Sequence, residues 1–193
     1  MAASGVGNDR VRLFCALQLP DETVEAIAAW QREQLQGEHV HGGRIVPAEN
    51  LHVTLVFLGS RHLGEVPAIA TELRAAAHAA RPASFKLRGY RETPRVGMLV
   101  LEEAGVSHAA ALVSDLERRL SGLGIDLRVR RPWRPHITVI RFRERAGLAP
   151  PLPNIRSIHV VRCALYRSSL GRGSAASSGA RYDALETAAL GGR

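Results

Sequence analysis

Two short segments of this sequence repeat one pattern of proton-carrying residues. His52-Val53-Thr54-Leu55 and His136-Ile137-Thr138-Val139 each place a histidine two residues before a threonine, and an apolar residue follows each threonine. Histidine has an unperturbed pKa of about 6.5, so near neutral pH it can either accept or donate a proton. A threonine hydroxyl can donate a hydrogen bond to an oxygen that carries negative charge. The two copies therefore indicate acid–base hydrolysis, and a phosphodiester is the substrate class that suits them.

Both segments alternate as half-buried β-strands do. Because residues two apart in a strand share a face, we expect His52 and Thr54 to point one way, and His136 and Thr138 to share a face of their own strand. The apolar residues of the first copy, through Phe57, should take the opposite face. If both strands line one groove, two imidazoles and two hydroxyls converge there. No carboxylate cluster accompanies them, so the sequence predicts neither a metal site nor a cofactor.

The segments around the motifs alternate between strand-like and helix-like patterns. Strands joined both by helices and directly to one another indicate an α+β fold with largely antiparallel sheets. Each half contains a helix followed by one His-x-Thr strand, and the two histidines lie 84 residues apart. This spacing predicts a duplicated pair of lobes. We expect helices over 21–37, 65–80 and 107–120, and strands over 11–19, 51–58, 84–91, 96–102, 125–130, 136–140, 157–167 and 182–187.

The composition is that of a globular domain. The 193 residues are 46% hydrophobic and 23% charged, which excludes disordered and fibrous classes, and no apolar run reaches the roughly 18–20 residues of a membrane span. Residues 1–9 lack the features of a secretion signal. We therefore expect a flexible tail over 1–9, a single bilobal domain over 10–193 and a cytoplasmic location. With only Cys15 and Cys163, no disulfide framework is expected.

The charge is strongly basic and comes almost wholly from arginine. The net charge is +8, and Lys86 is the only lysine among the 26 basic residues. Guanidinium groups pair well with phosphate and stack on bases, so this balance favours a phosphorylated or nucleic-acid ligand, although a solvated basic surface is an equal alternative. One acid, Glu144, interrupts a basic run around the second motif that contains Arg128, Arg130, Arg131, Arg134, Arg141, Arg143 and Arg145.

The residues flanking the motifs extend the pattern over most of the chain. They include Arg12-Leu13-Phe14-Cys15-Ala16-Leu17, Val46-Pro47-Ala48-Glu49-Asn50-Leu51 before the first motif, Phe57-Leu58-Gly59 after it, Arg134-Pro135 before the second, and Leu165-Tyr166-Arg167-Ser168-Ser169-Leu170 with Tyr182 near the end. In these segments the sequence resembles the RNA 2′,3′-cyclic phosphodiesterases, historically called 2′-5′ RNA ligases, of the 2H phosphoesterase superfamily.

The resemblance implies a bilobal, pseudo-twofold fold of two mainly antiparallel sheets, with helices on the outer faces and a central active-site groove. It also implies metal-independent opening of a terminal 2′,3′-cyclic phosphate to a 2′-phosphomonoester. In such a reaction His52 matches the general acid for the O3′ leaving group, and His136 matches the residue that activates water. Thr54 and Thr138 complete the expected catalytic set.

Two further residues are candidates for substrate binding. Arg141 lies five residues after His136, where the family's second motif usually carries an arginine, and it is a candidate phosphate clamp. Period-two counting puts Arg141 on the face opposite His136 unless the strand twists or bulges after Val139. Phe14 matches a position that can stack on the terminal base, and a core aromatic residue is the equal alternative.

We therefore interpret the chain as a monomeric hydrolase of RNA 2′,3′-cyclic phosphate ends or small cyclic nucleotides, without a membrane or an obligate protein partner. One alternative is RNA 2′-5′ ligation, the reverse reaction, in which a 5′-hydroxyl replaces water. The other is a non-catalytic RNA-binding module that uses the basic groove.

Overall fold

The fold is known from a computed structural model, which describes residues 9–35, 42–127, 132–170 and 180–191. Its helices are α1 (Asp21–Gln34), α2 (Val66–Ala79) and α3 (His108–Gly122). Its strands are β1 (Arg10–Gln18), β2 (Arg44–Ile45), β3 (His52–His62), β4 (Ala83–Glu92), β5 (Val96–Glu103), β6 (His136–Arg141), β7 (Ile158–Val160), β8 (Arg162–Leu170) and β9 (Ala180–Ala189). Residues 1–8, where we expect a tail, lie outside the described part.

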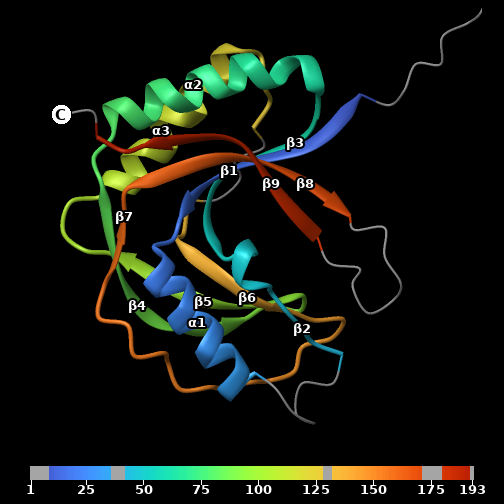
Figure 1. Cartoon of the computed structure of the whole chain (residues 1–193), viewed down its shortest axis with the longest axis vertical. Coiled ribbons are helices and arrows are strands. Elements are labelled where there is room, and N and C mark those ends of the chain that lie inside the picture. The colour runs from blue at the N-terminus through green and yellow to red at the C-terminus, as the bar shows by residue number, and fades with distance from the viewer. Residues whose placement is uncertain (1–8, 36–41, 128–131, 171–179, 192–193) are drawn as a thin grey trace, which may run out of the picture.

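The strands form one curled antiparallel sheet (Figure 1). Its order is β7-β4-β5-β6-β3-β1-β8-β9, with β2 added beside β6. The two sheets expected from the sequence meet where β3 pairs with β6, through the register pair Val53–Ile137. The hydrogen bonding therefore runs from one half into the other, and the α+β class is confirmed. Both His-x-Thr segments lie on these two central strands.

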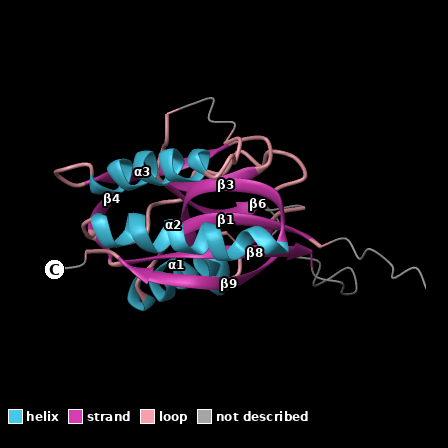
Figure 2. Cartoon of the chain, turned by 90° about the horizontal axis from the view of Figure 1, so that it is seen from above, coloured by secondary structure: helices cyan, strands magenta, loops and turns pink. Residues whose placement is uncertain are grey.

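The helices cover the outer faces of the curl. α2 and α3 lie side by side and α2 packs on β8 and β9, as Figures 1 and 2 show. α1 lies on the other half (Figure 1), where the buried Gln31 amide donates to the carbonyls of Val46 and Val139. No helix among the described residues is long and apolar enough to span a membrane.

Some element boundaries differ from those expected. α1 begins at Asp21, as expected, but ends at Gln34 and not at residue 37. Pro20 takes the capping position, and its carbonyl accepts the first helical hydrogen bonds. The expected strand over 157–167 is divided into β7 and β8 at the exposed Val161. Ile125–Leu127 are not in a strand, and 128–131 of that expected strand lie outside the described residues.

Candidate active site

The two motifs lie side by side at the centre of the sheet. Val53 and Ile137 face each other in the antiparallel register and are both fully buried. In an antiparallel pair centred on these residues, His52 stands beside Thr138, and Thr54 stands beside His136. All four polar side chains are half-buried on the face opposite to Val53 and Ile137. The fold thus brings together the four residues expected to act.

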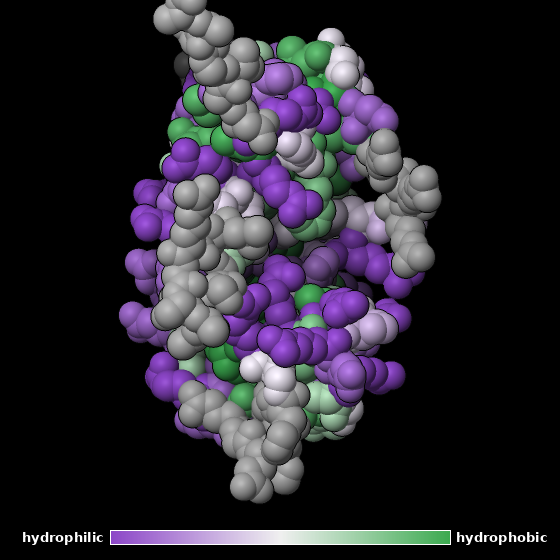
Figure 3. Space-filling view, turned by 90° about the vertical axis from the view of Figure 1, so that its right-hand side faces the viewer, coloured by the Kyte–Doolittle hydropathy of each residue, from purple (hydrophilic) through white to green (hydrophobic). Residues whose placement is uncertain are grey.

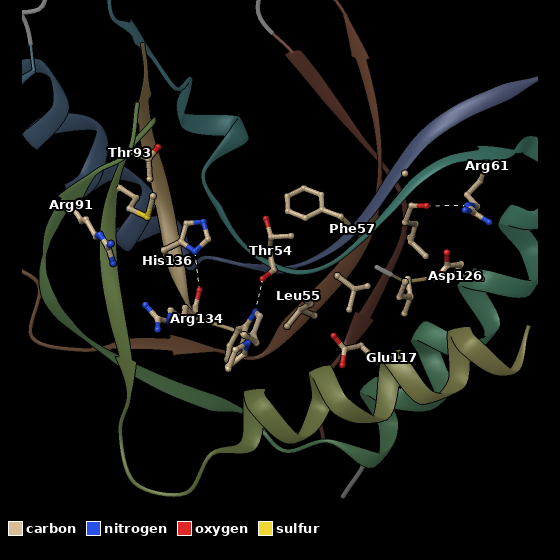
Figure 4. A pocket seen from close by; sticks show the side chains of 17 residues that line it. Thr54, Leu55, Phe57, Arg61, Arg91, Thr93, Glu117, Asp126, Arg134 and His136 are labelled. Atoms are coloured by element: carbon tan, nitrogen blue, oxygen red, sulfur yellow. Dashed lines mark hydrogen bonds between the residues drawn. The ribbon is translucent and has the colours of Figure 1, made fainter. Parts of the chain in front are cut away.

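Each histidine is held through the same ring nitrogen. His52 Nδ1 lies 2.7 Å from the carbonyl of Asn50, and His136 Nδ1 lies 2.8 Å from the carbonyl of Arg134. Because a carbonyl only accepts, both Nδ1 atoms carry a proton and donate it, which leaves Nε2 as the reactive nitrogen. His52 Nε2 lies 3.0 Å from the Thr54 hydroxyl. Figure 4 shows His136 with the contact to Arg134 that orients it.

His52 is neutral in the free protein. Its pKa is lowered to about 4, mainly by burial and further by the electrostatic influence of Arg141 and His136, while the hydrogen bond to the Asn50 carbonyl acts in the opposite direction. At neutral pH the Nε2 lone pair is therefore available, and an anion beside the ring would be needed to favour the imidazolium form.

Both central strands bulge at the third residue after their histidine. In β3, Cys15 of β1 pairs with Val56 while Ala16 pairs with Thr54, so Leu55 is an extra residue. In β6, Gly97 of β5 pairs with Ile140 while Met98 pairs with Thr138, so Val139 is the extra residue. An extra residue reverses the alternation of every position after it.

The first bulge corrects one expectation. Phe57 does not take the face of Val53. It is 71% exposed, and its ring lies 6.1 Å from Phe14, which itself lies 5.0 Å from the His52 ring. Phe57 therefore belongs to the polar face that carries His52 and Thr54, because the bulge at Leu55 shifts it there.

The second bulge acts on Arg141 in the same way. Strict alternation would place the Arg141 side chain on the face opposite His136. The extra residue Val139 shifts it to the face that carries His136 and Thr138. Arg141 Nη2 donates to the Tyr182 hydroxyl at 3.3 Å, and the Tyr182 ring meets the His52 ring edge-on at 5.4 Å. The effect of Arg141 on the His52 pKa agrees with this placement.

Phe14 lies deeper than a base-stacking residue would. It is only 4% exposed, and it is stacked on Tyr166 and touched edge-on by Tyr182, with ring centroids 5.1 and 4.9 Å away. Its nearest functional contact is the His52 ring. The structure thus places Phe14 as a support beneath the histidine, while Phe57 is the ring open to solvent.

A groove of about 1140 Å³ runs along this face. Thr54, Phe57 and His136 line it, and His52 lies beside it through its contact with Thr54. Sequence reasoning missed the groove residues Arg91, Thr93 and Trp133, which come from other elements; Trp133 Nε1 donates to the Thr54 carbonyl at 2.9 Å. Trp133 lies only three residues before His136 in sequence, whereas Arg91 is brought into this row by the sheet register, opposite Met98.

The surface around the groove is polar. Figure 3 shows a face of the molecule that is hollowed between its two halves, with hydrophilic side chains gathered along the lower half. Among the described residues, no three His, Cys, Asp or Glu side chains converge as metal ligands would.

Comparisons with known proteins point to one family. The family model of the 2′-5′ RNA ligase superfamily matches residues 19–165. Two relatives are named RNA 2′,3′-cyclic phosphodiesterase: one from Escherichia coli, 34% identical over 93% of this chain and 96% of its own, and one from Thermus thermophilus, 31% identical over 83% of each.

Solved structures agree with the sequence matches. A Thermus thermophilus protein, TT0787, superposes with a TM-score of 0.77 at 30% identity, covering 93% of this chain and 97% of that one. Escherichia coli LigT complexed with 3′-AMP superposes with a TM-score of 0.70 at 29% identity, covering 94% and 98%.

Proposed function

The chain belongs to the 2′-5′ RNA ligase superfamily, and from that membership and the site geometry we propose that it hydrolyses RNA 2′,3′-cyclic phosphate ends to 2′-phosphomonoesters. It is an enzyme of the cyclic phosphodiesterase type, in keeping with relatives of that name over most of its length. His52, Thr54, His136 and Thr138 are the proposed catalytic residues, with no metal in the reaction.

The observation that carries the proposal is the matched pair of histidines. Both rings direct Nδ1 at a carbonyl two residues earlier, so both leave Nε2 for chemistry on the same face of the sheet. Hydrolysis of a phosphodiester needs one group to remove a proton from water and another to supply a proton to the leaving oxygen. Two imidazoles that differ only in protonation meet both needs.

The proposed reaction uses the two sides of the cyclic phosphate. His136 Nε2 takes a proton from water as the water oxygen bonds to phosphorus, and the bond from phosphorus to O3′ breaks. His52 Nε2 gives its proton to O3′, which leaves as the 3′-hydroxyl while the phosphate stays on O2′. The hydroxyls of Thr54 and Thr138 donate to the non-bridging oxygens, where charge is concentrated.

The low pKa of His52 fits this scheme once the substrate is counted. In the free protein, burial is the main reason that His52 is neutral, and the guanidinium of Arg141 acts in the same direction. A cyclic phosphate carries one negative charge, and in the groove it offsets the charge of Arg141 and favours the imidazolium form of His52. Substrate binding thus favours the protonated form of His52, which is the form that acts as the general acid.

Two alternatives share the same groove. Ligation would run the reaction in reverse with a 5′-hydroxyl as nucleophile, and hydrolysis should prevail because water greatly outnumbers such hydroxyls. A non-catalytic RNA-binding module would not require two oriented Nε2 atoms. The physiological substrate is an RNA end or a small cyclic nucleotide, met by a monomer in the cytoplasm.

The test is an oligonucleotide that ends in a 2′,3′-cyclic phosphate, incubated with the protein and resolved by electrophoresis. We expect a phosphomonoester product from the wild type, with a rate about 10²- to 10⁴-fold lower for His52→Ala and for His136→Ala. His159→Ala is the matched control, because His159 is exposed on the edge strand β7. A joined product would indicate the ligase, and binding without any product would indicate the RNA-binding module.

A further inference from the structure

Two arginines that the proposed reaction does not use line the groove on the side of His136. Arg91 comes from β4 and Arg134 from the segment that leads into β6, and both side chains are exposed. Within the part of the chain that the structure describes, neither guanidinium has a hydrogen bond or an ion pair. By contrast, Arg88 on the same strand as Arg91 is paired with Glu102. Two guanidiniums without a partner at a groove are available to an anionic ligand.

A bulge in β4 turns Arg91 toward the groove. In the pairing with β5, Arg88 is an extra residue between Leu87 and Gly89. Strict alternation would put Arg91 on the face of Leu87, which packs against the core, and the extra residue reverses this. The next residue, Glu92, points to the other face, where its carboxylate accepts from two backbone N–H groups. Glu92 is therefore not placed to neutralise Arg91.

The sheet register puts Arg91 in line with the proposed catalytic residues. Arg91 pairs with Met98 of β5, and Met98 pairs with Thr138 of β6. Thr138 in turn stands beside His52. Neighbouring strands are about 4.8 Å apart, so the backbone of Arg91 lies about 10 Å from that of Thr138. A long guanidinium side chain in this row can therefore approach a phosphate that is one ribose away from the reacting one.

The two ends of the groove carry opposite charge. Figure 4 shows Arg91 and Arg134 on the side of His136. Glu117 and Asp126 lie at the opposite end. A phosphate is attracted at the first end and repelled at the second. A ligand with two phosphates is thus favoured in one orientation, with its second phosphate toward the arginines.

We propose that Arg91 and Arg134 form a subsite for a second phosphate, the one bound to O5′ of the ribose whose 2′,3′-cyclic phosphate is opened. This assignment rests on the proposed hydrolysis, and it makes the group on O5′ a determinant of specificity. The internucleotide phosphate of an RNA end and the 5′-phosphate of a small nucleotide present the same chemistry there. The planar fork of a guanidinium suits both, because it can donate two hydrogen bonds to one phosphate.

The test compares three substrates that differ only at O5′. They are a nucleoside 2′,3′-cyclic phosphate with a free 5′-hydroxyl, the same compound with a 5′-monophosphate, and a dinucleotide that ends in the same cyclic phosphate. We expect the wild type to show a kcat/KM for each phosphorylated substrate about 10- to 150-fold above that for the first, the range for one hydrogen bond to a charged group. Arg91→Ala and Arg134→Ala should each lower this ratio, and the double variant should bring it close to one.

The control is Lys86→Ala, which removes a positive charge from an exposed position of the same strand outside the groove and should keep the wild-type ratio. The phosphorylated substrate with the larger arginine-dependent ratio identifies RNA or a small nucleotide as the source of the phosphate. Wild-type ratios near one, or a preference that survives in the double variant, would overturn the subsite. Failure of the wild type to open any of the three substrates would instead overturn the proposed function, so the two failures are distinguishable.

Discussion

Each histidine commits its Nδ1 to a backbone carbonyl, Asn50 for His52 and Arg134 for His136. This arrangement fixes the tautomer and orients both rings, while burial, aided by the charge of Arg141, holds the His52 pKa low. The charge of the ligand then decides the protonation state of the site.

The pKa of His52 should respond to an anion. In the free protein it lies near 4 instead of the usual 6.5, so the ring stays neutral from pH 8 down to pH 5. Added inorganic phosphate places negative charge near the cations that lower the pKa, and the pKa should rise. An NMR titration of the histidine ring signals, with His52→Gln to assign them, measures both values. A His52 that titrates near 6.5 without phosphate, or one that phosphate leaves unchanged, would contradict this electrostatic account.

Arg141→Ala should lower turnover as well as binding. A guanidinium that bonds to the reacting phosphate contributes about 1.5–3 kcal/mol, so kcat/KM should fall by about 10- to 150-fold, with part of the loss in kcat. Arg156→Ala removes the same charge from an exposed site far along the chain and serves as the control. If only KM rises, and rises less at high salt, then Arg141 merely adds to the basic field and does not touch the phosphate.

At the scale of elements, the bulge in β6 depends on a neighbour without a side chain. Gly97 of β5 pairs with Ile140 directly beside the extra residue Val139. A Cβ at position 97 would lie 2.1 Å from the Tyr90 hydroxyl oxygen and 2.6 Å from Ile140 Cγ2. Tyr90 cannot move away easily, because its hydroxyl donates to Glu92, whose carboxylate also accepts from the backbone N–H groups of Gly147 and Leu148.

Gly97→Ala should therefore displace Ile140 and with it Arg141. We expect a loss of about 1–3 kcal/mol in the free energy of unfolding, measured in urea, and a fall in kcat that resembles Arg141→Ala. The control is Gly89→Ala on the same hairpin, where an added Cβ meets open space. Wild-type kcat in a folded Gly97→Ala protein would mean that Arg141 is positioned independently of the bulge.

The bulges separate the side-chain orientations that the sequence predicts correctly from those that it does not. Alternation placed both His-x-Thr pairs on strands correctly, since their apolar partners Val53 and Ile137 are buried as predicted. It failed after the threonines, where Leu55-Val56 and Val139-Ile140 are consecutive apolar pairs, both members of which are buried. Such pairs are a signal of a bulge, but the extra residue becomes certain only from the register of the neighbouring strand.

At the scale of the whole molecule, the site is assembled by the order of the strands. β3 and β6 come from different halves of the chain and meet through one register pair, while the rings that surround His52 come from β1, β8 and β9. The duplication of a motif 84 residues apart predicted two lobes, but no local pattern predicts which strands adjoin. Arg91 at the groove and the contact of Tyr182 with His52 therefore emerge only from the fold.

The net charge is also a property of the whole molecule. Of the arginine-rich run, the structure describes Arg134 at the groove, Arg141 beside Tyr182, the exposed Arg143, and Arg145, which is paired with Glu92 at 3.5 Å. A net charge of +8 attracts an anionic ligand such as RNA to the molecule. The described arginines at the groove concentrate positive charge there.

One measurement tests the central claim most directly: a single turnover of a 2′,3′-cyclic phosphate oligonucleotide in ¹⁸O-labelled water with excess chelator, read by phosphorus NMR. The account predicts a 2′-phosphate that carries one ¹⁸O atom, because water attacks phosphorus, O3′ leaves with a proton from His52, and no metal takes part. A 3′-phosphate would exchange the roles of His52 and His136. A phosphate without ¹⁸O, or turnover that appears only when a divalent ion is restored, would contradict hydrolysis by the two histidines.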